Sequence, residues 1–216
     1  MDPISENTMV VLLTEGCIMT RSLSWRSSFT DVPVWAEKAI NWLSARNVVT
    51  GTSATKFTPS KNVTRAEFIA MLMRTIQVPI STAGVKQFSD VAAGKWYYND
   101  ILKAKALGIA AGNSSGKFNP TAPIKREDIA VLIGRIAETC SYSLKYDSGE
   151  TQCQRFDDNA DISGYAAYYM EMMVQNGILN GSSNKLRPRA NATRAEAAAM
   201  IHRLLLTDIE TITKGL

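Results

Sequence analysis

The sequence contains little histidine, cysteine or aromatic residue. Its 216 residues include one histidine, three cysteines and 8% aromatic residues. A zinc enzyme or a Ser-His-Asp hydrolase needs well-placed histidine with further partners, so the single His202 argues against both. Three cysteines are too few for a disulfide-framework miniprotein. Thirteen glycines, seven prolines and 45% hydrophobic residues exclude collagen-like and disordered chains.

Long apolar runs are also missing. No stretch approaches the roughly 20 apolar residues that a membrane helix needs, so no transmembrane segment is expected. The most apolar run near the start, residues 9–13, follows Asp2 and Glu6 rather than a basic segment and makes a poor signal peptide. Residues 1–28 match nothing later in the chain. They are left unassigned, as the tail of a preceding region or a sequence artefact.

Two of the cysteines bracket a short polar segment. Cys140 and Cys153 could close residues 141–152 into a loop in an oxidising compartment, or they could be two thiols in a linker. Both alternatives stay open.

The chain contains three copies of one ordered pattern. Each copy opens with Phe-x-Asp, reaches an aromatic residue, and has a glycine 16 residues after that aromatic. An apolar residue then stands two places before a proline, and five residues after the proline comes Thr-Arg-Ala-Glu or a variant of it. Six landmarks in order, three times, indicate internal repeats. The copies start at Phe29, Phe88 and Phe156, with aromatics Trp35, Trp96 and Tyr165, glycines Gly51, Gly112 and Gly181, and motifs at 64–67, 125–128 and 193–196.

These landmarks divide the chain into three units and their connections. The predicted organisation is 1–28 unassigned leader, 29–78 repeat 1, 79–85 linker, 86–139 repeat 2, 140–154 linker, 155–207 repeat 3 and 208–216 tail.

Each repeat is expected to hold two helices joined by a turn. Apolar residues at helical spacing predict a first helix over 35–47, and Gly51 is expected to close the turn in a left-handed conformation. The second helix begins at the motif, where Thr64 with Glu67 and Thr193 with Glu196 can form capping boxes. Lys125 cannot cap as threonine does, although Asp128 still favours a helix N-terminus.

One such unit of about 50 residues cannot bury its apolar face alone, whereas three copies can share a core. The predicted fold is therefore all-α: three helix-loop-helix repeats forming a pseudo-threefold, three-pronged trimer around a central three-helix bundle. The chain would be a monomer with an internal pseudo-trimer, and grooves would lie between neighbouring repeats.

The Phe-x-Asp opening, the helix-starting aromatic, the glycine turn, the Phe-x-Pro step and Thr-Arg-Ala-Glu together resemble the S-layer homology domain family over about residues 29–206. The resemblance implies a non-catalytic anchoring module with no cofactor or metal, located outside the cell in the cell wall or S-layer. Its implied partner is secondary cell wall polysaccharide of the peptidoglycan-linked envelope, a pyruvylated amino sugar polymer bound in grooves between repeats. The motif arginine would contact the anionic sugar.

Charge and chemistry agree with an anionic ligand. The three repeats carry +3, +3 and +1, whereas the leader, the 140–154 linker and the tail each carry −1. A guanidinium offers two parallel donors to a carboxylate, and a helix N-terminus favours anions. The motif arginines are Arg65, Arg126 and Arg194.

Each site residue also has a structural interpretation. The arginines could be solvated, or could pair with Asp31, Asp90 and Asp158. Those aspartates are expected to cap a turn or orient a neighbour. The three aromatics could stack on a sugar or anchor the core, and the three glycines are expected first as turn residues whose N–H groups could also meet the ligand.

The alternative function is a protein–protein interaction scaffold at the cell surface, because paired-helix repeats commonly bind peptides. A glycosidase needs two positioned carboxylates, and the repeated acids look structural, so no enzyme activity is expected. No nucleic-acid-binding motif accompanies the pI of about 9.0, so no nucleic-acid partner is expected.

Overall fold

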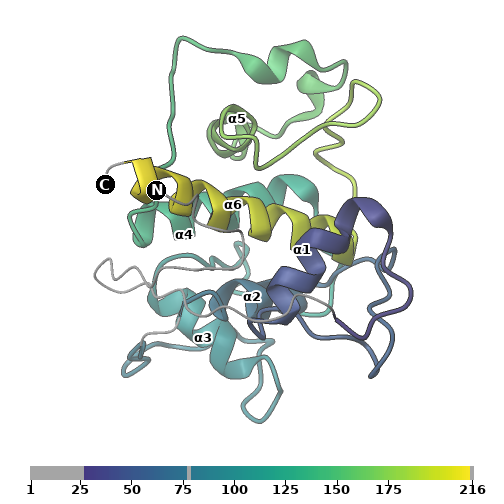
Figure 1. The fold of residues 1–216 in the computed structure, drawn as a ribbon. Helices are drawn as coiled ribbons and strands as arrows, with labels where there is room; N and C mark the ends of the chain where they lie inside the picture. Colours follow the sequence, from purple (N-terminus) through teal and green to yellow (C-terminus); the bar gives the residue numbers. More distant parts are fainter. Residues whose placement is uncertain (1–26, 77–78, 215–216) are drawn as a thin grey trace.

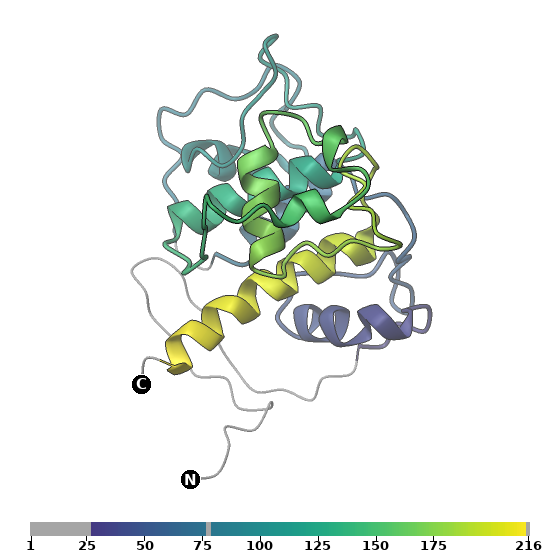
Figure 2. The same cartoon turned by 90° about the horizontal axis from the view of Figure 1, so that it is seen from above.

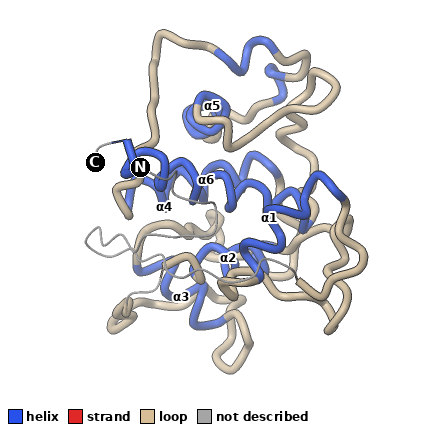
Figure 3. The backbone as a smooth tube through the Cα atoms, in the orientation of Figure 1, coloured by secondary structure: helices blue, strands red, loops and turns tan. Residues whose placement is uncertain are grey.

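The protein is built from helices and long loops (Figures 1 and 3). The computed structural model describes residues 27–76 and 79–214, so most of the unassigned leader lies outside it. Its elements are α1 (Val34–Ser44), α2 (Arg65–Met73), α3 (Tyr98–Ala106), α4 (Arg126–Thr139), the 3₁₀ helices η1 (Gln152–Arg155) and η2 (Asn159–Asp161), α5 (Ala167–Gln175) and α6 (Arg194–Lys214). These residues form isolated β-bridges but no strand, and the predicted all-α class is confirmed.

The first helix of each repeat ends in the same way. Asn47, Gly108 and Gly177 have φ of 58°, 73° and 65°, and each lies four residues before the glycine shared by the repeats. In the first repeat the next N–H, of Val48, donates to the Leu43 carbonyl at 2.9 Å. This is a Schellman ending. The expectation that Gly51 supplies the left-handed residue was wrong, because the helix has already ended at Asn47.

The second helices begin as the motif predicts. In α2 the Thr64 side chain accepts from the Glu67 N–H while the Glu67 carboxylate accepts from the Thr64 N–H, which completes a capping box. Thr193 and Glu196 make the same reciprocal bonds at the start of α6. Lys125 makes no side-chain cap at the start of α4, as expected. Helix α6 runs on to Lys214, so the predicted boundary after residue 207 lies inside a helix.

Helices pack between repeats rather than within one repeat. The main helix contacts pair α1 with α6, α3 with α2 and α5 with α4, so each first helix covers the second helix of the preceding repeat in cyclic order. Figures 1 and 2 show α1 beside α6, although they are the first and last helices of the chain. The two helices of one repeat are separated by a loop of about 20 residues, which leaves the first helix free to reach a neighbour.

Backbone hydrogen bonds close the cycle. The Val63 N–H donates to Ala192 at 3.0 Å, the Ala192 N–H to Ile124 at 2.9 Å, and the Ile124 N–H to Val63 at 3.0 Å. Each of these residues lies two positions before a second helix, so α2, α4 and α6 converge at their N-terminal ends. Repeats 1, 2 and 3 are thereby joined in a closed hydrogen-bonded ring.

The interface of α1 and α6 contains the single histidine. His202 is 6% exposed, lies edge-on to the Trp42 ring with 5.3 Å between centroids, and its Nε2 has no hydrogen-bond partner in the part of the chain described. Burial, assisted by the positive charges of Lys38, Arg203 and Arg46, lowers the pKa of His202 to about 4. The histidine therefore packs as a neutral side chain.

The His202→Met variant tests this burial. Met73 occupies the equivalent position in α2. A histidine whose pKa falls from 6.5 in the unfolded chain to about 4 in the folded protein contributes stability above pH 6.5, and that contribution is lost as the pH falls toward 4. Urea unfolding should show wild type losing about 3 kcal/mol relative to the variant over this window. A stability difference independent of pH would contradict the prediction.

Candidate functional site

The three Phe-x-Asp aspartates hold the loop that leads to the second helix. Asp31 accepts from the N–H groups of Phe57 and Thr58 at 2.9 and 3.0 Å, one on each carboxylate oxygen. Asp90 accepts from the N–H groups of residues 118 and 119 in the same way. Asp158 accepts from those of residues 186 and 187, and all four distances are 2.7–2.8 Å. Each aspartate thus fixes the Phe-x-Pro step of its own repeat, which is Leu-x-Pro in repeat 3.

These bonds favour the charged carboxylates. The Phe57 amide lowers the pKa of Asp31 most, and the Thr58 amide adds to it. Burial alone would raise the pKa of Asp90, but its two backbone donors outweigh that and lower it. Both aspartates therefore clamp the loop as anions.

The three shared glycines lie against the phenylalanine rings that open each repeat. A Cβ at Gly181 would lie 2.3 Å from Cε1 of Phe156, and one at Gly51 would lie 2.4 Å from Cε1 of Phe29. At Gly112 the distance to Phe88 would be 2.9 Å. None of the three has positive φ. Their requirement is close ring packing, which the turn interpretation missed.

The motif arginines join one repeat to the next. The Arg65 Nε donates to the Phe118 carbonyl at 2.8 Å, and the Arg126 Nε donates to the Leu186 carbonyl at 2.8 Å. Arg194 Nε donates to Phe57 at 3.0 Å and completes the cycle. Arg126 and Arg194 are only 7% and 4% exposed.

The ion pairs of these arginines also cross repeat boundaries. Arg126 forms an ion pair with Glu196, with 3.1 Å between nitrogen and oxygen. The equivalent pairs are Arg65 with Asp128 at 3.3 Å and Arg194 with Glu67 at 3.8 Å. The alternative pairing with Asp31, Asp90 and Asp158 was wrong, because those carboxylates are occupied by backbone amides. Burial lowers the pKa of Arg126 and the charge of Glu196 opposes that shift.

The three helix-start aromatics face solvent. Trp35, Trp96 and Tyr165 are 60%, 61% and 58% exposed, which is unusual for such large side chains. The core-anchor alternative does not describe them. Their exposed ring faces can stack on another molecule.

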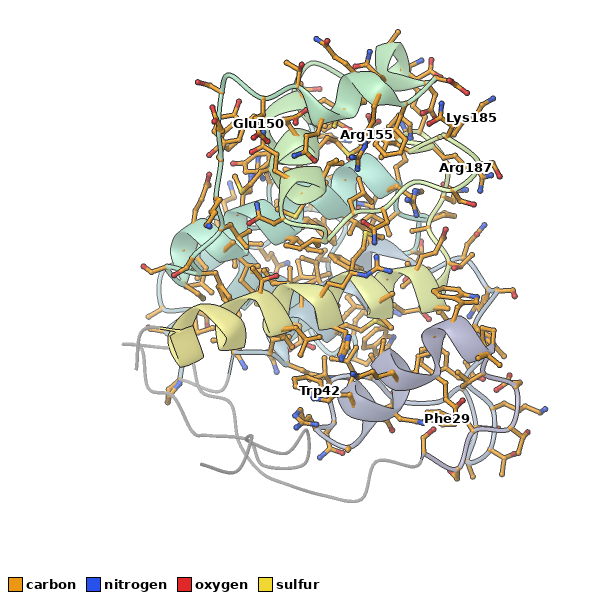
Figure 4. The ribbon with its side chains drawn as sticks, turned by 45° about the horizontal axis from the view of Figure 1, so that its top comes forward. Phe29, Trp42, Glu150, Arg155, Lys185 and Arg187 are labelled. Atoms are coloured by element: carbon orange, nitrogen blue, oxygen red, sulfur yellow. The ribbon has the colours of Figure 1, made fainter. Side chains whose placement is uncertain are left out.

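One groove brings together a predicted residue from each repeat. It has a volume of about 360 Å³, and Trp35 of repeat 1, Arg126 of repeat 2 and Gly181 of repeat 3 line it. The remaining charges in its wall are Lys185, Arg187, Arg203 and Glu196. Figure 4 shows Lys185 and Arg187 on the loop before α6, at one edge of the molecule. An aromatic face beside several cations suits a sugar that carries negative charge.

The other predicted residues occupy equivalent positions and do not line this groove. By repeat register, Trp96, Arg194 and Gly51 correspond to one further inter-repeat surface, and Tyr165, Arg65 and Gly112 to another. In the last of these the Tyr165 hydroxyl donates to Asp128 at 2.7 Å, and burial first and then Asp128 raise the pKa of that hydroxyl. The three surfaces are therefore chemically unequal.

Two further sets of cations escaped the sequence interpretation. A lysine directly precedes the buried Phe57, Phe118 and Leu186, and an arginine follows each motif arginine by nine residues. Those second arginines donate to carbonyls a few residues after the end of a first helix, at 3.1–3.4 Å; they are Arg74, Arg135 and Arg203. Their fixed spacing in all three repeats was the signal that could have found them.

The cysteine alternative resolves in favour of thiols. Cys153 is a free, buried thiol, so the loop closure with Cys140 is not formed. Burial, helped by Glu171, raises the pKa of Cys153 to about 12, which leaves the thiol protonated and unreactive.

Among the residues described, no helix is long and apolar enough to cross a membrane. Within the same residues, no cluster of three or more potential metal ligands occurs.

Three all-α repeats closed into a ring, with an aromatic and cationic groove between them, define a repeat module. The S-layer homology domain model matches residues 28–69, 87–130 and 155–198. The chain belongs to the S-layer homology domain family. Membership marks it as a module for attachment at the bacterial cell surface.

Known relatives share this segment within longer proteins. An amylopullulanase of Thermoanaerobacterium thermosulfurigenes is 36% identical over 85% of this chain and 10% of its own length. The exoglucanase XynX of Acetivibrio thermocellus is 37% identical over 82% of this chain and 16% of its own. An S-layer protein of Bacillus thuringiensis subsp. finitimus is 29% identical over 90% of this chain and 23% of its own length. The chain thus spans less than a quarter of each of these relatives.

Gly181→Ala should destabilise the protein by roughly 1–3 kcal/mol, because its Cβ would overlap the Phe156 ring and the Lys185 carbonyl. Gly164→Ala is the matched control, since a Cβ there meets nothing within 4 Å and the backbone is not left-handed. It should be neutral or slightly stabilising. Urea unfolding of both variants checks the pair, and equal stabilities would contradict the close-packing role.

Proposed function

We propose that this chain is a non-catalytic anchoring module that binds anionic, pyruvylated secondary cell wall polysaccharide in grooves between its repeats. It would thereby tether the protein of which it is part to the bacterial envelope. The groove lined by Trp35, Arg126 and Gly181 is the observation that carries the proposal, because each residue comes from a different repeat.

The chemistry of that groove suits a pyruvyl ketal on a sugar. The exposed Trp35 ring can pack against the C–H face of a pyranose. The carboxylate of a ketal can bind the nearby lysine or arginine side chains. Among the described residues that line the groove, the single acid is Glu196, and it already pairs with Arg126. Cations therefore exceed free acids where the ligand would lie.

The buried arginines contribute in a particular way. Arg126 uses Nε and Nη2 to hold the carbonyls of Leu186 and Asn180, so its guanidinium forms part of the groove wall. We propose that it presents its remaining donor capacity to the ligand while fixing the wall. Arg65 and Arg194 would do the same on the other two surfaces.

The shared segment fits an anchoring role in relatives of different kinds. Two relatives are named as an amylopullulanase and an exoglucanase, and another is named as an S-layer protein. A module common to such different proteins supports attachment rather than catalysis as its own task.

Co-sedimentation with cell-wall sacculi tests the function. The protein should pellet with sacculi that retain their polysaccharide and stay in solution when the polymer or its pyruvyl group has been removed. Binding should weaken as salt rises, because part of it is electrostatic. Binding that survives removal of the glycan would instead support the protein-interaction scaffold.

Trp35→Ala should weaken sacculus binding about tenfold, the loss of roughly 1.4 kcal/mol of stacking. Because Trp35 is largely exposed, its replacement should leave the melting temperature nearly unchanged. Tyr168→Ala, which removes another exposed aromatic residue away from the groove, is the control and should bind normally. Equal losses in both variants would contradict a site at the groove.

A further inference from the structure

The residue between the buried apolar landmark and the proline has a left-handed backbone in every repeat. Thr58, Asn119 and Arg187 have φ of 53°, 58° and 53°. Their N–H groups donate to the aspartates of the clamps, and these bonds hold the left-handed conformation in place. Asparagine tolerates it, whereas a β-branched threonine or a long arginine is sterically disfavoured there.

Arg187 is unlike its two counterparts in charge and in surroundings. It is exposed and lies beside Lys185 in the groove lined by Trp35, Arg126 and Gly181, which we call the Trp35 groove. Its guanidinium makes no hydrogen bond or ion pair with any described residue. Asn119 and Thr58 place no charge at the equivalent point of the other surfaces. At repeat-equivalent positions, the Trp35 groove therefore has one more cation than either of the other two surfaces.

This cation is both unpartnered and placed on a disfavoured backbone. Stability alone favours asparagine at such a position, and repeat 2 has one. Core packing gives no reason for arginine at 187, because the side chain is exposed. An anion in the groove would supply the missing partner.

We infer that Arg187 binds the anionic substituent of the polysaccharide and makes the Trp35 groove the strongest of the three sites. The inference rests on the proposed function and deepens it. A guanidinium can take a carboxylate through two parallel donors, with Lys185 and Arg126 on the same wall adding to the attraction. The free-energy cost of the left-handed backbone at Arg187 is thus offset by a gain in the free energy of binding.

Arg187→Asn separates stability from binding. Relief of the disfavoured backbone should raise the melting temperature by about 2–4 °C. Affinity for polysaccharide-bearing sacculi should fall about tenfold. Calorimetry with a methyl glycoside carrying a pyruvate ketal should show the same loss, and the matching glycoside without the ketal should bind wild type and variant equally weakly.

Two variants serve as controls. Thr58→Asn relieves the same backbone conformation outside the Trp35 groove, so it should raise the melting temperature and leave wall binding within about twofold of wild type. Arg189→Asn removes an exposed charge two residues away that does not line the groove, and it should change neither quantity.

The outcomes distinguish this inference from the function beneath it. A wild-type protein that fails to bind polysaccharide-bearing sacculi overturns the proposed function. Wild-type binding with an unchanged affinity in Arg187→Asn overturns only the role of Arg187. A lower melting temperature in Arg187→Asn, or an equal loss of binding in Arg189→Asn, also overturns that role.

Discussion

The bond from a motif arginine to the carbonyl of the next repeat is the interaction on which the structure depends. Arg65, Arg126 and Arg194 each use Nε for it, and the three bonds close a cycle with the backbone ring of Val63, Ile124 and Ala192. Buried donors left without partners are costly, so no repeat can be removed without exposing or orphaning groups in the other two. The same bonds place the N-terminus of one second helix against the loop of its neighbour. Stability and the formation of inter-repeat grooves therefore have one cause.

A shared backbone permits unequal side chains. The aspartate clamps, glycine contacts and Schellman endings recur in every repeat, which fixes where the outward-facing residues stand. The residue types at these positions vary. The first two repeats have Trp35 and Trp96, whereas the third has Tyr165, whose hydroxyl donates to Asp128. A tyrosine held by a neighbouring carboxylate is less available to a ligand than an exposed tryptophan ring. The conserved geometry supplies three positions for a site, and the variable residues decide what each can bind.

Local features were predictable from the sequence, and cyclic contacts were not. Thr64 and Glu67 are three residues apart, so the capping box could be inferred from spacing alone. Arg65 and Phe118 are 53 positions apart, and only the closure of three repeats brings them together. The wrong prediction for Gly51 has a similar origin. A glycine at this position of every repeat resembles a helix stop, but the ring that requires it belongs to Phe29, which is distant in sequence. The long loops carried no signal that first helices would pack on the preceding repeat.

Net charge is a poor guide to the charge that a ligand meets. Repeat 3 has the lowest net charge of the three, +1, yet its loop supplies Lys185 and Arg187 to the most clearly formed groove. Two of its acids are engaged by backbone N–H groups: Asp158 accepts from residues 186 and 187, and Glu171 accepts from residues 152 and 153. In the other direction, Arg194 counts as a full cation but is buried and bonded to the Phe57 and Thr50 carbonyls. Affinity for an anion depends on cations that are exposed and unpartnered, so a single residue such as Arg187 can outweigh a difference of two in the net charge of a repeat.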